Sequence, residues 1–234
     1  MTLSRRLLLP VAILAGITAA SLEAKAAEPY LTAAQLDLTA LIPPPPQPGS
    51  DADKADVAAV LAAQANASEA RKAGALADSD QSIYQVFTPV LGEKFTKANT
   101  PKAAAFFERI GKSEGATLNP AKDIFKRVRP WIAHTDIKPV AEPTKSFCYP
   151  SGHVTRAAMF TIMMAAIVPE KKAEIWARAQ DYAQSRVIGG MHYPSDVAVS
   201  WSTGAAMSTL MLQQPGFQAD MAAARAEIRG LLGL

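Results

Sequence analysis

The sequence predicts an all-α protein that folds as a single helical domain. Its 234 residues suit one domain with a sizeable core. From Asp51 onward the chain is rich in alanine, with apolar residues at helical spacing. No alternating run of β-branched residues is long enough to build a sheet.

Composition excludes several classes of protein. Hydrophobic residues make up 49% and charged residues 19%, which is outside the range of disordered chains. The single cysteine, Cys148, cannot form an internal disulfide, and three histidines are too few for a Cys/His zinc framework. Packing alone must therefore hold the fold together.

Residues 1–26 read as a cleaved export signal peptide. Arg5 and Arg6 precede an apolar run from Leu7 to Ala20, and Ala24-Lys25-Ala26 has the small residues that a signal peptidase requires. The alternative of a stable membrane span needs about 20 apolar residues, more than this run supplies. We expect a periplasmic protein, exported by the Sec or the twin-arginine route. Removing these residues lowers the net charge from +3 to +1, which gives no support for nucleic-acid binding.

Residues 27–50 form an N-terminal arm, in which residues 42–50 make a stiff polyproline segment. Residues 51–234 form the helical domain. Its expected helices span 51–76, 82–95, 101–114, 120–129, 152–168, 170–188, 194–213 and 217–231. The stretch 77–82 between two of them is a candidate cover for a site, although no motif supports it.

Prolines mark several of the expected helix ends. Asn119 is a suitable N-cap, with Pro120 at the first helical position, where its missing N–H costs nothing. That helix must end near Arg129, because the proline that follows disfavours α geometry in the residue before it. Pro169 and Pro194 are expected to start two more helices.

The first segment with chemical interest runs from Lys122 to Arg129. At about 100° per residue, these two cations lie on one helix face, two turns apart, and can reach the same anion. The alternative is a solvated basic face, since Lys126 and Arg127 lie between them.

The second segment, Ser151-Gly152-His153, precedes an apolar helical run. Ser151 can cap that helix, and Gly152 lets a ligand approach the backbone, so the free N–H groups of the first turn can bind phosphate. His153 would then stand beside the anion, placed to protonate a leaving oxygen. The alternative is a plain capping turn with an incidental histidine.

The third segment runs from Ser185 to Asp196. Arg186 continues the buried stripe of Ile175 and Tyr182, and a buried guanidinium needs a partner such as phosphate. After a glycine pair, Asp196 follows His192 by four residues, near enough to bind Nδ1–H and leave Nε2 free as a nucleophile. The alternative is a core histidine followed by a capping aspartate.

Together the segments read Lys-x6-Arg-Pro, Pro-Ser-Gly-His and Ser-Arg-x5-His-x3-Asp. This set resembles the signature of the acid phosphatase superfamily that includes type 2 phosphatidic acid phosphatases and vanadium haloperoxidases. The resemblance implies the all-α, single-domain fold of the type 2 phosphatidic acid phosphatases and haloperoxidases. The export signal, the proline run and the chain length most resemble bacterial class A non-specific acid phosphatases.

The resemblance implies a role for each residue. His192 would be the nucleophile, oriented by Asp196, and His153 the acid and then the base. The phosphoryl oxygens would be held by Lys122, Arg129, Ser151, Gly152, His153 and Arg186. Neither a cofactor nor a metal ion is expected, because these cations and a helix N-terminus supply the positive potential.

We therefore expect an acid phosphatase that hydrolyses small phosphate monoesters through a phosphohistidine, with phosphotransfer to alcohols as a side activity. Phosphate and vanadate should inhibit it, and self-association is expected by analogy alone. Two alternatives stay open: a lipid or pyrophosphate phosphatase of the same superfamily, and a non-catalytic phosphate-binding helical protein.

Overall fold

The protein is described by a computed structural model that covers residues 28–234, so the expected signal peptide, residues 1–26, lies outside the described part. Within that part the chain is all helical, as predicted, with no strand. The helices are α1 (Leu38–Leu41), α2 (Asp51–Asn66), α3 (Glu69–Ala77), α4 (Ile83–Leu91), α5 (Pro101–Phe125), α6 (Pro130–Ala133), α7 (Gly152–Ile167), the 3₁₀ helix η1 (Pro169–Lys171), α8 (Lys172–Ile188), α9 (Pro194–Leu212) and α10 (Pro215–Leu232).

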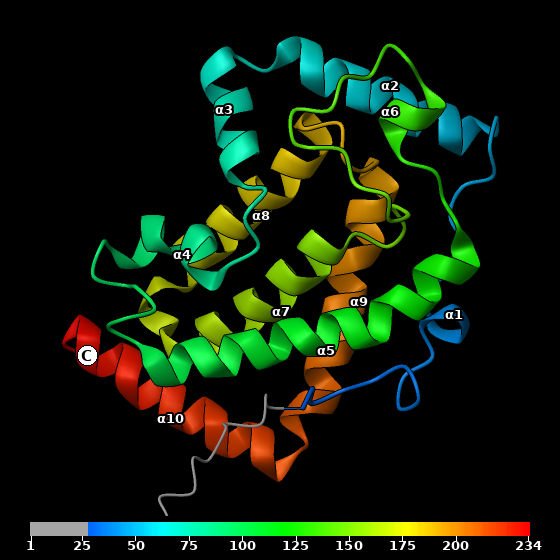
Figure 1. Cartoon of the computed structure of the whole chain (residues 1–234). Coiled ribbons are helices and arrows are strands. Elements are labelled where there is room, and N and C mark those ends of the chain that lie inside the picture. The colour runs from blue at the N-terminus through cyan, green and yellow to red at the C-terminus, as the bar shows by residue number, and fades with distance from the viewer. Residues whose placement is uncertain (1–27) are drawn as a thin grey trace, which may run out of the picture.

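Helix α7 is the centre of the fold. It contacts α4, α5, α8, α9 and α10, and Figure 1 shows it behind α5, between α8 and α9. Most of its residues are apolar and buried, among them Phe160 and Met163, as expected for a helix surrounded by others. Since α7 begins at Gly152, this packing fixes the position of the predicted phosphate-binding turn.

The helix predicted over 51–76 is two helices. Helix α2 ends at Asn66, and Ser68 starts α3, with its hydroxyl accepting a hydrogen bond from the Arg71 N–H. Serine competes well for this N-cap position, which explains the break inside an alanine-rich stretch.

The predicted helix start at Asn119 and Pro120 is wrong, because α5 continues through both residues. Pro120 cannot donate to the carbonyl of Ala116, one turn before it. The N–H of Ala33 donates to that carbonyl instead, over 3.2 Å. A partner from the N-terminal arm thus satisfies the group that the proline leaves free, and the helix tolerates the proline.

The predicted helix end at Arg129 is also wrong. Helix α5 ends at Phe125, where Lys126 adopts the left-handed conformation with φ 52° and caps the helix. Arg129 then has extended backbone and precedes α6, which starts at Pro130. Lys122 and Arg129 therefore do not share a helix face, and the chain turn after α5 is what brings them together.

The other predicted starts are confirmed. Ser151 caps α7, Pro169 starts η1, which leads into α8, and Pro194 starts α9. No single helix within residues 28–234 is long and apolar enough to cross a membrane. Gly152–Ile167 and Pro169–Ile188 reach that limit only as a pair, and this pair is bent by 119°.

Candidate active site

Six of the eight predicted site residues line one cavity of about 430 Å³. They are Lys122, Arg129, Gly152, His153, Arg186 and His192. They come from α5, the turn before α6, the start of α7, the end of α8 and the α8–α9 loop. The two others, Ser151 and Asp196, are fully buried behind this wall and support it.

Three cations face the cavity from separate elements. Lys122 Nζ donates to the carbonyl of Phe147 at 3.0 Å, and burial together with the nearby Arg129 lowers the pKa of Lys122 to about 8. Arg186 donates to the carbonyl of Asp78 at 2.9 Å. Its Nε is buried without a hydrogen-bond partner. An unpaired donor of a buried guanidinium is costly, and an anion in the cavity would satisfy it.

His192 is held in one tautomer. Its Nε2 lies 2.8 Å from Nη1 of Arg129, which also donates to the carbonyl of Met191. Because a guanidinium only donates, Nε2 must carry the lone pair and Nδ1 the proton. Burial, followed by the positive charges of Arg129 and Lys122, lowers the pKa of His192 well below its ordinary value. The imidazole is thus neutral, with the unprotonated nitrogen toward the cations.

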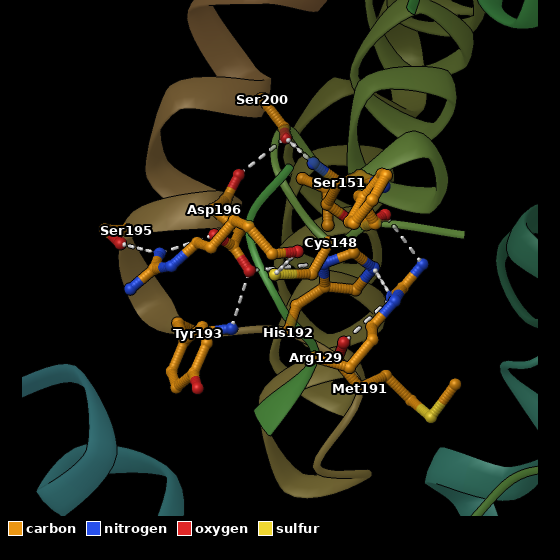
Figure 2. Close-up of polar contacts among 12 residues, drawn as sticks. Arg129, Cys148, Ser151, Met191, His192, Tyr193, Ser195, Asp196 and Ser200 are labelled. Atoms are coloured by element: carbon orange, nitrogen blue, oxygen red, sulfur yellow. Dashed lines mark hydrogen bonds and ion pairs between the residues drawn. The ribbon is translucent and has the colours of Figure 1, made fainter. Parts of the chain in front are cut away.

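Asp196 lies beside His192 but does not form the expected hydrogen bond. Its Oδ2 is 3.4 Å from Nδ1 of His192, which has no hydrogen-bond partner, and Oδ2 accepts from the Tyr193 N–H at 2.9 Å. Figure 2 shows Asp196 between Tyr193 and Ser200, next to the imidazole. Complete burial raises the pKa of Asp196 to about 6, although Arg127 favours the carboxylate.

His153 stands in the first turn of α7, and its Nε2 lies 3.2 Å from the carbonyl oxygen of Ser79. The carbonyl only accepts, so Nε2 carries a proton there. Burial and the nearby Arg186 lower the pKa of His153 well below its ordinary value. Part of the segment 77–82 lies at the site. Ser79 and Gln81 line the cavity, and the carbonyls of Asp78 and Ser79 contact Arg186 and His153.

The start of α7 is anchored from two sides. Ser151 donates its N–H to the hydroxyl of Ser200 on α9 at 2.8 Å, and its own hydroxyl accepts from the Val154 N–H. A Cβ on Gly152 would lie 2.7 Å from Oε1 of Glu114 on α5. The glycine therefore permits a close approach of the α5 side chain to this helix N-terminus.

The sequence does not identify Arg127 as part of the site. Its pattern indicates Arg127 only as a contributor to a possible solvated basic face. Arg127 is buried, with 6% of its side chain exposed. It donates to Asp196 at 2.6 Å, to Asp56 on α2 at 2.8 Å and to the Ser195 hydroxyl at 2.7 Å. Its guanidinium also lies 4.1 Å from the centre of the Tyr193 ring. Nothing local in the sequence marks Arg127, since its partners are far away along the chain.

Neither Cys148 nor His134 belongs to the wall of the cavity. Cys148 is completely buried, and its Sγ lies 3.3 Å from the carbonyl of Arg127. His134 follows α6 outside the cavity, with its ring 6.4 Å from that of Tyr193. Over residues 28–234, no group of three or more His, Cys, Asp or Glu side chains could hold a metal ion.

Comparison with known proteins gives consistent results. The PAP2 superfamily matches residues 112–220, which include every predicted site residue. A non-specific acid phosphatase of Salmonella typhi is 31% identical over 196 residues, which is 80% of this chain and 78% of the relative. One from Providencia stuartii is 27% identical over 211 residues, or 86% and 85% of the two chains.

A solved structure shares the fold. It is a transmembrane PAP2 type phosphatidylglycerolphosphate phosphatase of Bacillus subtilis, with a TM-score of 0.54 and 20% identity over 73% of this chain and 88% of that one. At this identity the likeness concerns the fold alone. From the family match, the curated relatives and the fold, we conclude that the chain is a phosphatase of the PAP2 superfamily and belongs to its non-specific acid phosphatases.

Proposed function

We propose that the protein is an exported acid phosphatase that hydrolyses phosphate monoesters through a phosphohistidine on His192, without a metal ion. The observation that carries this proposal is the meeting of two imidazoles and three buried cations in one cavity. Binding an anion needs only the cations, whereas a nucleophile and a proton donor are needed for turnover.

In the first step, Nε2 of His192 attacks the phosphorus atom. The N–P bond forms as the bond between phosphorus and the ester oxygen breaks, and His153 gives its proton to the departing alcohol. Arg129 donates to Nε2 in the free protein. A phosphoryl oxygen would take over that donor and free the lone pair. Lys122, Arg129 and Arg186 then offset the charge that spreads over the equatorial oxygens.

In the second step, His153 accepts a proton from water as the water oxygen attacks the phosphohistidine. Inorganic phosphate leaves, and both imidazoles return to their starting states. An alcohol in place of water would take the phosphoryl group in the same way, which accounts for phosphotransfer as a side activity. Asp196 would stabilise the positive charge that His192 carries in the phosphohistidine, from its position 3.4 Å from Nδ1.

The proposed site of action is the periplasm. It rests on the basic start, apolar run and Ala24-Lys25-Ala26 sequence of residues 1–26, which lie outside the described residues. Fractionation of cells that express the full chain tests it. We expect a periplasmic product that lacks residues 1–26, and an uncleaved cytoplasmic product would contradict export.

Trapping of the phosphoenzyme tests the chemistry. The protein is mixed with p-nitrophenyl phosphate in EDTA at mildly acidic pH, quenched in alkali and measured by intact mass. We expect one phosphoryl group on the wild-type chain and on the control His134→Ala, and none on His192→Ala. Loss of turnover in EDTA would contradict the metal-independent mechanism. Full activity of His192→Ala would contradict the assignment of the nucleophile.

A further inference from the structure

A second cavity, of about 480 Å³, adjoins the phosphate cavity. Gln81 and Arg156 line both cavities. The apolar part of its wall comes from α4, α5 and α7, and it consists of Ile83, Tyr84, Ala104, Phe107 and Phe160. The two cavities are therefore neighbours that share part of their wall, and we call the two together the groove.

The groove follows facing stripes on two helices. On α7, His153, Arg156 and Phe160 are spaced by three and four residues, so they lie on one helix face. His153 lines the phosphate cavity, Phe160 the second cavity, and Arg156 both. On α5, Lys122 and Glu114 line the first cavity and Phe107 the second.

An ion pair crosses the groove between the two cavities. Arg156 Nη2 donates to Glu114 Oε2 at 2.6 Å, which joins α7 to α5. The same nitrogen lies 3.3 Å from the carbonyl of Gly111, and Nε of Arg156 is buried without a hydrogen-bond partner. Arg156 is the more exposed partner, with 24% of its side chain exposed against 7% for Glu114. A ligand that reaches from one cavity into the other would therefore have to displace the side chain of Arg156 rather than that of Glu114.

We propose that the second cavity is the subsite for the leaving group and that it takes the ring of an aromatic alcohol. The Arg156–Glu114 pair then lies at the boundary between this subsite and the phosphate cavity. This inference rests on the proposed function. In that mechanism the proton donor stands at the ester oxygen, so the leaving group extends from the phosphorus on the side of His153. From His153, the α7 face leads past Arg156 to Phe160, into the second cavity.

The lining favours a ring over a long acyl chain. Tyr84 is half-buried and offers one aromatic face on which a planar ligand can stack. Phe107 and Phe160, which are 1% and 3% exposed, form an apolar floor beneath it. The rest of the wall includes the charged side chains of Lys97 and Glu108, against which an extended hydrocarbon would gain nothing. The cavity is also of the size that ordinary small-molecule sites have, about 300–1,000 Å³.

A variant that fills the second cavity tests the proposal. Ala104→Leu adds bulk at the wall, and Ala198→Leu is the control, because Ala198 is an exposed residue of α9. The substrates are 2-naphthyl phosphate and glycerol phosphate, and inorganic phosphate serves as inhibitor. We expect Ala104→Leu to lower kcat/KM for the naphthyl ester about 10-fold or more relative to glycerol phosphate, mainly through KM. The inhibition constant of phosphate should stay unchanged in both variants.

A second variant keeps the test valid if Ala104→Leu fails to fold. Tyr84→Leu removes one aromatic face from a half-buried position and should lower the same preference. An unchanged ratio between the two substrates in a folded variant would overturn the subsite. If the wild-type chain hydrolysed neither ester, the proposed function itself would fail. If it hydrolysed both esters and the variants left the preference unaltered, only the subsite would fail.

Discussion

Arg127 stabilises the candidate site through buried charge, so its removal should destabilise the whole protein. Its guanidinium binds the carboxylates of Asp196 at 2.6 Å, Asp56 at 2.8 Å and Asp53 at 3.4 Å. In Arg127→Met the methionine fills much of the same volume, but two of these carboxylates have 7% or less of their side chains exposed. Removing one partner of a buried ion pair costs about 3–5 kcal/mol, because the other charge stays buried and unpaired.

Urea denaturation followed by circular dichroism measures this loss as a change in the free energy of unfolding. The control is Arg229→Met, which removes the same side chain from a solvent-screened pair with Glu170 and should therefore cost much less than Arg127→Met. Adding Asp56→Asn to Arg127→Met should recover part of the stability, since one unpaired carboxylate disappears. A loss for Arg127→Met no larger than that of the control would refute the reasoning.

The remaining predictions concern pH and backbone geometry. Burial and nearby cations lower the pKa of His192 and of His153 below about 6.5. With rising pH, kcat/KM should therefore increase as His192 loses its proton and decrease as His153 loses its own, so that the maximum lies at acidic pH. Arg156→Gln removes a cation near His153, raises its pKa, and should move the high-pH limb upward; a pH profile with an unmoved limb would count against this. Gly190→Ala should lower the free energy of unfolding in urea by about 1–3 kcal/mol. Gly190 has a φ of +65°, and the new Cβ would lie 3.1 Å from the Lys138 carbonyl oxygen. An unchanged free energy of unfolding would contradict this geometry.

The sequence predicted the all-helical class and most helix starts, because serine caps and prolines act locally. It failed at Pro120, since the partner that satisfies Ala116 is the N–H of Ala33, more than eighty residues away. It also failed at Arg129, where the left-handed turn at Lys126 ends α5 early. Such long-range contacts and turns leave no periodic pattern in the sequence.

The candidate site was predictable to the extent that its residues carry motifs. His153 and His192 line one cavity, as the motif set required. Arg127 was not predictable, because its burial depends on Asp56 of α2 and Asp196 of α9. The expected hydrogen bond from His192 to Asp196 does not form: Oδ2 lies 3.4 Å from Nδ1 and is oriented by the Tyr193 N–H at the start of α9, from which it accepts. Spacing alone brings the two side chains close but does not align them.

The central claim is that the imidazoles of His192 and His153 act on opposite sides of one phosphorus atom. The most direct test is a crystal structure with vanadate, which adopts the five-coordinate geometry of the transition state. We predict vanadium bonded to Nε2 of His192, with the opposite apical oxygen within hydrogen-bond distance of the His153 ring and the equatorial oxygens on Lys122, Arg129 and Arg186. Vanadate bound elsewhere, or both rings on the same side of the metal, would contradict the mechanism.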